Sequence, residues 1–267
     1  MELGIKNRTA VITGGSRGIG KAAAIELAKE GCNIVLIARG SDKLYEAVLE
    51  IKSFGVDVIS ISADLSSKEY IESSFNKIID RFKKIDILFN NAGVSANGKK
   101  PIEKTENDFE EHFNIHFKAT YRFCNLVIPI MIKQQWGRII NMGSMAGIST
   151  LSGTSVYSAA KAAVINYTNS LALEYSKYGI CANTICPGLI YTDIWSEVAQ
   201  MLSENKNISK EEVLNLAADK LSAAKRFAKP AEVGKVVAFL ASECASFISG
   251  DSIRVDGGAL SGIEMNL

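Results

Sequence analysis

Short apolar runs that alternate with helix-like segments constrain this chain more than any other feature of its sequence. The runs are nearly continuous in apolar residues instead of alternating with polar ones. Strands of that composition are buried on both faces, as in a parallel sheet covered by helices on each side. They occur at residues 9–13, 33–38, 57–63, 85–93, 137–144, 180–188 and 252–258.

Segments with helical periodicity fill the intervals between these runs. Crossovers between parallel strands are right-handed, so strand–helix alternation winds into a doubly wound sheet. No internal repeat, low-complexity tract or linker interrupts the 267 residues. The sequence therefore predicts an α/β Rossmann fold with a seven-stranded parallel sheet, as a single domain spanning residues 1–267. The expected helices cover about 18–30, 42–53, 66–82, 105–135, 155–178 and 230–242.

Polar residues at expected helix starts support these boundaries. Ser66 followed by Glu69 has the spacing of a capping box, and Thr105 with Asp108 marks a further helix start. Pro230 suits a first helical position.

One region, about 189–228, departs from the rhythm of strand and helix. It contains Trp195 and a polar stretch at 203–207 that we expect to be a hinge. Ser209 with Glu212 then has the spacing of a helix cap. Two helices inserted after the carboxyl end of a strand are well placed to form a lid over a ligand crevice. The alternative interpretation is a packing or subunit-contact element.

Charge and composition exclude several classes of protein. The chain has 30 basic and 29 acidic side chains and a formal net charge of +1, which gives no sign of a nucleic-acid or anionic-membrane partner. Neither a signal peptide nor a bilayer-spanning apolar run is evident, so we expect a soluble, cytoplasmic protein. The five cysteines are scattered and lack metal-ligand spacing, which favours reduced, mostly buried thiols.

A glycine-rich loop, "TGGSRGIG" at 13–20, follows the first strand and opens the first helix. Gly14, Gly18 and Gly20 would allow tight turning and a close approach of the backbone to a phosphate. The helix behind them offers free N–H groups and a positive dipole end. A glycine cluster alone is weak evidence, but the strand–turn–helix context favours a phosphate-binding loop over an ordinary turn.

The second strand ends in Ala38 and Arg39, where a dinucleotide fold that binds NAD would place an acid on the adenosine ribose. Arg39 and Arg17 are two guanidiniums suited to a 2′-phosphate. NADP(H) is therefore favoured over NAD(H), the alternative being that both arginines are solvated surface charges. Asp64, which closes the third strand, could accept a hydrogen bond from the adenine amino group.

Tyr157 and Lys161 lie four residues apart in an Ala-rich helix, and so on one face. Ser144 ends the fifth strand thirteen residues earlier, and Asn114 lies in the helical region before that strand. The Tyr–Lys spacing alone would fit an amphipathic helix with one exposed lysine. Together with Ser144, Asn114 and the phosphate loop it indicates a catalytic site.

Seven motifs in the right order resemble the short-chain dehydrogenase/reductase family, over about residues 7–258. They are "TGGSRGIG" (13–20), "NNAG" (90–93), Asn114, Ser144, "YSAAK" (157–161), "PG" (187–188) with Thr192, and "GDSIRVDGG" (250–258). The resemblance implies an NAD(P)-dependent oxidoreductase, commonly a homotetramer and otherwise a homodimer, with Asn114, Ser144, Tyr157 and Lys161 as catalytic residues.

The chemistry of carbonyl reduction accounts for these residue types. A hydride goes to carbon and a proton to oxygen, and a free tyrosine with a pKa of about 10 exchanges protons poorly near neutrality. We expect the Lys161 ammonium and the oxidised nicotinamide to lower the pKa of Tyr157. The resemblance further implies that Lys161 bonds the nicotinamide ribose, that Asn114 holds a water chain behind it, and that Ser144 steadies the substrate oxygen.

The cofactor contacts implied by the loop, the strand ends and the resemblance form one set. Its members are Gly14, Ser16, Arg17, Gly18, Ile19, Gly20, Arg39, Asp64, Leu65, Asn91, Ala92, Gly93, Tyr157, Lys161, Pro187, Gly188, Ile190 and Thr192. Of these, Thr192 and the backbone near Ile190 are placed to grip the carboxamide.

The substrate pocket should be walled by the lid and by loops after the fourth and fifth strands. The expected residues are mainly apolar, which favours a neutral ketone or secondary alcohol. They are Val94, Ser95, Ala96, Met145, Ala146, Leu151, Leu189 and Trp195.

Two substrate classes remain open. A carbonyl reductase or alcohol dehydrogenase for a small ketone is slightly favoured over a 3-oxoacyl-thioester reductase. Relatives that take carrier-protein substrates tend to have basic residues where this chain has Gln135 and Tyr178. A catalytically silent NADP(H)-binding protein is a remote alternative, because fold does not determine function.

His112 and His116 are spaced to share a helix face, but no H-E-x-x-H pattern accompanies them and no metal is expected. Helix packing or a subunit interface is the favoured interpretation. The apolar stripe through Phe109, Phe117 and Phe123 similarly indicates a core or helix–helix contact.

Overall fold

The central sheet has seven strands, all parallel, in the order β3-β2-β1-β4-β5-β6-β7. It is seen in a computed structural model that describes residues 2–96, 98–149 and 151–259. The other residues of the single domain predicted over 1–267 lie outside the described ranges. The strands are β1 (Thr9–Thr13), β2 (Asn33–Ala38), β3 (Val58–Ser62), β4 (Ile87–Asn90), β5 (Gly137–Met142), β6 (Ile180–Pro187) and β7 (Ser252–Val255).

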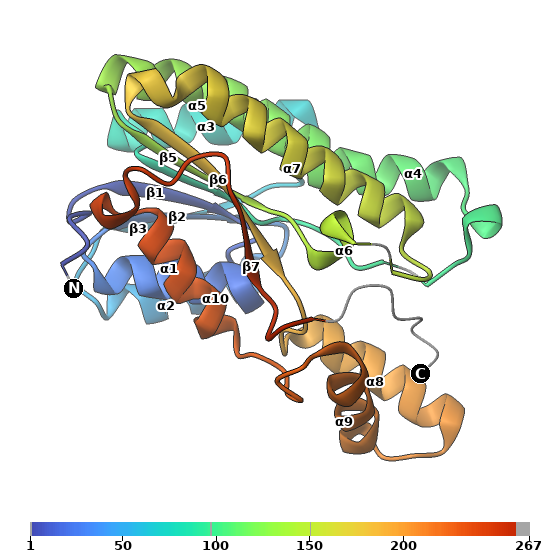
Figure 1. Ribbon diagram of the computed structural model, residues 1–267. Coiled ribbons are helices and arrows are strands. Elements are labelled where there is room, and N and C mark those ends of the chain that lie inside the picture. The colour runs from blue at the N-terminus through green and yellow to red at the C-terminus, as the bar shows by residue number, and fades with distance from the viewer. Residues whose placement is uncertain (1, 97, 150, 260–267) are drawn as a thin grey trace.

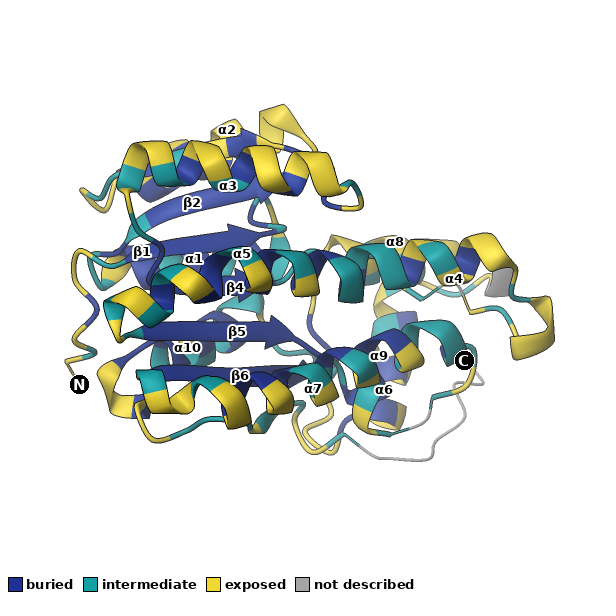
Figure 2. Ribbon diagram, turned by 90° about the horizontal axis from the view of Figure 1, so that it is seen from above, coloured by how far each residue is buried: buried dark blue, intermediate teal, exposed yellow. Residues whose placement is uncertain are grey.

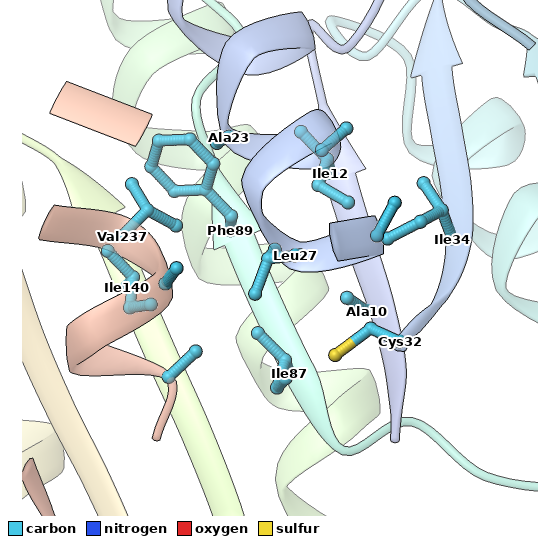
Figure 3. Close-up of a cluster of buried hydrophobic side chains, with 14 of the residues drawn as sticks. Ala10, Ile12, Ala23, Leu27, Cys32, Ile34, Ile87, Phe89, Ile140 and Val237 are labelled. Carbon is cyan, nitrogen blue, oxygen red and sulfur yellow. The ribbon is translucent and has the colours of Figure 1, made fainter. Parts of the chain in front are cut away.

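Helices cover both faces of this sheet, as the continuous apolar strands predict (Figures 1 and 2). Two buried apolar clusters, one on each face, hold the three layers together. One face carries α1 (Gly18–Lys29), α2 (Ser41–Lys52) and α10 (Pro230–Leu240), and Figure 3 shows part of its core. The other face carries α3 (Lys68–Phe82), α5 (Ala119–Gln134) and α7 (Ser155–Tyr175). The seven-stranded Rossmann architecture predicted from the sequence is confirmed.

The long helical region expected at 105–135 consists of three parts with different hydrogen bonding. Thr105 and Asp108 form the predicted capping box at the start of α4 (Glu106–His112). A π-helix then spans Phe113–Lys118 before α5 begins. Wide π turns are frequent at functional sites. Here the π-helix carries Asn114.

Two local expectations need correction, and one helix was not predicted. The N-cap of α3 is Ser67 and not Ser66, because Ser67 Oγ accepts from the Tyr70 N–H while Ser66 bonds to Asp64. The polar stretch at 203–207 is mostly the last turn of α8 (Asp193–Lys206), so it is no hinge. A short helix, α6 (Met145–Ile148), was not predicted, since four residues carry no helical periodicity.

The predicted insertion after β6 consists of α8 and α9 (Lys210–Leu221), with Ser209 capping α9 as expected. We call these two helices with their connection the α8–α9 segment. Figure 1 shows it beyond the carboxyl ends of the strands and away from the two helical layers. It is therefore placed beside the edge of the sheet where ligands bind in such folds.

Other compositional expectations can be compared with the described residues. Cys32, Cys124, Cys181 and Cys186 are buried free thiols, whereas Cys244 is exposed. Phe123 of the aromatic stripe is fully buried, but Phe109 is 40% exposed, so only part of the stripe is core. Within the described ranges, no helix combines the length and apolarity that a membrane span requires.

A cluster of two arginines around a tryptophan lies at the end of the sheet where the strands begin. The Arg138 side chain of β5 is only 2% exposed, and its Cζ lies 4.4 Å from the centroid of the Trp136 ring. Arg8 stacks on the same ring at 3.7 Å. Arg138 donates to the carbonyls of Gly137 and Gly179 and pairs with Glu243 at 3.3 Å, so the buried charge is well compensated.

Replacing Arg138 with alanine should lower the free energy of unfolding by about 3 kcal/mol, because the change empties a buried site and leaves carbonyl groups unpaired. Urea denaturation measures the difference. Arg81→Ala, which removes a guanidinium paired with Asp57 where both side chains are exposed, is the matched control and should cost less than about 1 kcal/mol. Equal losses for the two variants would contradict the assigned role.

Candidate active site

One continuous cavity of about 1340 Å³ runs along the carboxyl ends of the strands and beneath the α8–α9 segment. Strand order reverses between β1 and β4, and such switch points open the ligand crevice of doubly wound sheets. Asn114, Ser144, Tyr157 and Lys161 all line this cavity. Every residue predicted to contact cofactor or substrate also lines it, except Gly20.

The glycine loop is tied to the turn after β4 by Asn91. The side-chain Nδ2 of Asn91 donates to the carbonyls of Thr13 and Gly14, at 3.0 and 3.2 Å. Thr13 Oγ1 in turn accepts from the N–H groups of Asn91 and Ala92. The amide of Asn91, predicted to contact the cofactor, thus binds the loop that would hold it.

Gly20 acts behind the loop instead of inside the cavity. A Cβ at this position would lie 2.3 Å from the Gly14 carbonyl oxygen and 2.6 Å from Asn91 Nδ2. Gly14 itself has a positive φ of 65°, which glycine adopts without strain. The absent side chains therefore let the loop fold tightly onto the start of α1 and direct its N–H groups at the cavity.

Three cations line the cavity at its adenosine end. Arg17 and Arg39 are those predicted from the sequence, and Lys43, in the first turn of α2, joins them. Sequence reasoning missed Lys43 because a lysine inside a helix after the second strand carries no motif. Ser66 donates to Asp64 Oδ1 through its N–H and its hydroxyl, and these bonds hold the pKa of Asp64 below its usual range. Asp64 therefore stays ionised as a hydrogen-bond acceptor.

Two helices and the end of β5 bring the proposed catalytic groups together. Ser144 is the N-cap of α6, and its Oγ accepts from the Ala146 N–H at 3.1 Å. Tyr157 and Lys161 lie one turn apart on α7, and the ring centroid of Tyr157 is 5.7 Å from Lys161 Nζ. Nζ donates to the Met142 carbonyl at 2.7 Å, which holds the buried ammonium against the end of β5.

Burial, and not the ammonium, dominates the titration of this pair. Desolvation raises the pKa of Tyr157, although a hydrogen bond with Ser144 opposes the rise, and desolvation lowers the pKa of Lys161 to about 7. Burial and the protein's own groups thus raise the pKa of Tyr157, and the expected lowering, which also includes the charge of the oxidised nicotinamide, stays a prediction. Burial disfavours the ammonium form of Lys161. When Lys161 is protonated, its Nζ donates to the Met142 carbonyl and not to the Tyr157 hydroxyl.

His112 and His116 pack against the catalytic tyrosine. Their rings stack with centroids 5.7 Å apart, and both meet the Tyr157 ring edge-on, at 5.9 and 5.2 Å. His116 Nε2 lies 3.1 Å from the Val94 carbonyl and so donates its proton to it. The packing between helices was predicted, but its position beside Tyr157 was not. No group of three His, Cys, Asp or Glu side chains in the described ranges could hold a metal ion.

Both histidines are neutral at physiological pH. Burial lowers the pKa of each, and it does so most for His116, where the nearby Lys161 is the second cause. The Nδ1 atoms of both rings are buried and have no hydrogen-bond partner among the described residues. The stacked pair consequently confines the Tyr157 ring without placing a further charge beside it.

The far end of the cavity is mainly apolar and includes all the residues predicted for the substrate pocket. The α8–α9 segment adds apolar side chains there, and the Trp195 ring is fixed edge-on against Phe227 with centroids 5.1 Å apart. Additional lining residues are Ile194, Val198, Met201, Leu202 and Leu221, with Glu111, Ser149 and Thr154 as polar neighbours.

Comparison with known proteins agrees with this geometry. A sequence model of the short chain dehydrogenase family matches residues 8–203. The 3-oxoacyl-[acyl-carrier-protein] reductase FabG of Aquifex aeolicus is 34% identical over 259 residues, which are 97% of this chain and 99% of that protein. The chain therefore belongs to the short-chain dehydrogenase/reductase family, whose members are oxidoreductases acting on C=O and CH–OH groups.

Two solved structures are similar over nearly the whole chain. L-sorbose reductase from Gluconobacter frateurii, complexed with NADPH and L-sorbose, has a TM-score of 0.95 at 34% identity and covers 98% of this chain and 100% of its own. Levodione reductase has a TM-score of 0.87 at 31% identity, with 94% and 97% covered. Because 98% of this chain is covered, the fold shared with L-sorbose reductase includes the α8–α9 segment.

A methyl group at position 20 should disrupt the glycine loop. We expect Gly20→Ala to weaken NADPH binding about tenfold or more, because the Gly14 carbonyl or Asn91 must move. Fluorescence titration of the purified protein with NADPH measures the change. Lys29→Ala, an exposed position at the other end of α1 and outside the cavity, is the control and should alter affinity less than twofold. Unchanged binding by Gly20→Ala would exclude the close packing as a requirement.

Burial of Lys161 should make stability rise with pH. With a folded pKa of about 7 against an ordinary 10.5, the unfolded chain holds a proton that the native state lacks between those values. The cost of burying the ammonium is fully present below pH 7 and disappears as pH approaches 10.5. Between pH 7 and pH 10, the free energy of unfolding of the unmodified protein should therefore rise relative to that of the Lys161→Met variant.

Urea melts of both proteins at several pH values measure this difference. The exposed Lys77→Met variant, treated identically, corrects for the loss of one positive charge. A difference that stays constant or shrinks over this range would show that Lys161 is charged in the native state at alkaline pH.

Proposed function

We propose that the protein transfers hydride between NADP(H) and a small ketone or secondary alcohol, with Tyr157 as the acid/base. The observation that carries the proposal is the convergence of Asn114, Ser144, Tyr157 and Lys161 on one cavity. That cavity has a glycine loop and cations at one end and apolar walls at the other. It thus offers a site for a charged dinucleotide beside a site for a neutral substrate.

The residues present fit an NADP(H) cofactor. The glycine cradle would be filled by a Cβ at Gly14 or Gly20, and the first turn of α1 offers free N–H groups to a diphosphate. β2 ends without an acid, and Arg17, Arg39 and Lys43 supply positive charge for a 2′-phosphate. The NADPH in the L-sorbose reductase structure supports the same assignment.

When bound, the nicotinamide supplies or accepts the hydride at the substrate carbon. In ketone reduction, the Ser144 hydroxyl steadies the substrate oxygen while Tyr157 donates its phenolic proton to that oxygen. The resulting phenolate is disfavoured by burial, so it requires positive charge close by when it forms. Lys161 would provide that charge once protonated, and its pKa of about 7 lets it exchange protons near neutrality. Asn114, on the π-helix, would hold the water chain through which Lys161 is reprotonated.

The apolar walls support a small, mainly apolar ketone as the substrate. Leu151, Leu189 and Trp195 line the far end of the cavity with few charges. The α8–α9 segment would act as a lid that excludes water from the reacting atoms.

A 3-oxoacyl-thioester reductase is the second candidate, and the similarity to the FabG of Aquifex aeolicus favours it. Gln135 and Tyr178, in place of basic residues, argue against docking of an acidic carrier protein. Assembly into a homotetramer remains a prediction from the family resemblance.

The decisive experiment follows NADPH oxidation with a panel of ketones. It should include acetoacetyl thioesters, cyclic and aryl ketones, and a polyhydroxylated ketone such as L-sorbose. Tyr157→Phe should lower kcat by at least about 100-fold on any substrate that the unmodified protein reduces, because it removes the proton donor. Its dissociation constant for NADPH should stay within about threefold, since the ring and its histidine packing remain.

Each outcome of the panel separates the candidates. Turnover of ketones other than thioesters supports the small-ketone assignment, whereas turnover of thioesters alone overturns it. Tight NADPH binding without turnover of any substrate would indicate a catalytically silent binding protein. Full activity in Tyr157→Phe would exclude the tyrosine as the acid.

A further inference from the structure

The α8–α9 segment brings two acids against the cations at the adenosine end of the cavity. Asp193 is the first residue of α8, and its Oδ2 accepts from Arg17 Nη1 at 3.0 Å and from Lys43 Nζ at 3.4 Å. Glu197 Oε1 lies 3.8 Å from the same Arg17 nitrogen. The two acids are four residues apart, so one face of α8 presents both to the glycine loop.

The three cations come from three separate elements. Arg17 belongs to the glycine loop, Arg39 follows β2, and Lys43 lies in the first turn of α2. Arg39 has no side-chain hydrogen bond or ion pair to another described residue, whereas Arg17 and Lys43 share one carboxylate oxygen. All three cations and Asp193 line the same cavity. A dianion entering this end would therefore meet one cation that is free and two that already bind Asp193.

Asp193 is able to exchange these partners. Its side chain is 50% exposed, and the side chains of Arg17 and Lys43 are 46% and 58% exposed. Ion pairs at such exposed positions are weak and rearrange readily. The hydrogen bond from Arg17 holds the pKa of Asp193 below its usual range, so the carboxylate keeps its charge.

We propose that Lys43 is a third 2′-phosphate-binding cation and that Asp193 competes with the 2′-phosphate for Arg17 and Lys43. This inference rests on the proposed use of NADP(H). A 2′-phosphate and the Asp193 carboxylate need the same N–H donors. Because both would then lie beside Arg17 and Lys43, the two anions repel each other. Asp193 thus moderates the preference for NADP(H) over NAD(H), and the competition couples the start of α8 to the presence of the phosphate.

Competition and clamping by Asp193 predict opposite effects. If Asp193 only clamped α8 over the cofactor, its loss would weaken ligands with and without a 2′-phosphate alike. Competition affects only ligands that carry the phosphate, and in that case loss of the carboxylate strengthens binding. The sign of one substitution therefore decides between them.

Calorimetric titration of the purified protein with 2′,5′-ADP and with 5′-ADP, at constant low salt, tests the proposal without turnover. Asp193→Asn should tighten 2′,5′-ADP about threefold, as expected for an exposed ion pair, and change 5′-ADP by less than about 1.5-fold. Lys43→Gln should weaken 2′,5′-ADP by a similar factor. In the Lys43→Gln background, Asp193→Asn should give a smaller gain, because one of the two released cations is absent.

Matched controls lie on the same helices. Glu204→Gln, near the other end of α8, and Lys52→Gln, at the end of α2, remove like charges away from the cavity and should leave both affinities unchanged. Equal weakening of the two ligands by Asp193→Asn, or no effect, overturns the competition. No effect of Lys43→Gln on 2′,5′-ADP overturns the assignment of Lys43. An unmodified protein that binds both ligands equally would instead refute the NADP(H) preference itself.

Discussion

The close approach of the glycine loop to the turn after β4 is the constraint on which the site depends. Gly20 packs against the Gly14 carbonyl so tightly that no side chain fits between them, and Asn91 ties the loop to the neighbouring strand. This contact forms where the strand order reverses, between the parallel strands β1 and β4. It therefore opens the crevice and directs the N-terminus of α1 into it.

Burial sets the electrostatics at the other end of the cavity. Lys161 is buried and Tyr157 is partly buried in the cavity wall, and desolvation shifts their pKa values in opposite directions, up for the phenol and down for the ammonium. The phenol therefore resists losing its proton until a positive charge lies close by, and the amine resists taking up a proton until a negative charge such as the phenolate forms beside it. The neutral histidines packed on the Tyr157 ring preserve this arrangement, because a charged histidine there would repel the protonated Lys161.

The α8–α9 segment connects these two ends. Its apolar residues wall the substrate end, whereas its first residue, Asp193, pairs with Arg17 and Lys43 at the adenosine end. One element thus contacts both the substrate region and the cations proposed for the 2′-phosphate. In the competition proposed here, the presence of that phosphate would be felt at the start of the helix that carries Trp195.

The sequence by itself determined the strand and helix order, the parallel sheet and the residues around the cavity, because these follow from apolar periodicity, glycine spacing and local motifs. The sequence predicts helix caps where the hydrogen bonds are local, as at Thr105. For α3 the predicted cap, Ser66, lies one residue before the actual cap, Ser67. Only the tertiary structure brought His112 and His116 to Tyr157 and Asp193 to Lys43. These contacts join segments far apart in the chain, and the burial that raises the pKa of Tyr157 exists only once those segments pack together.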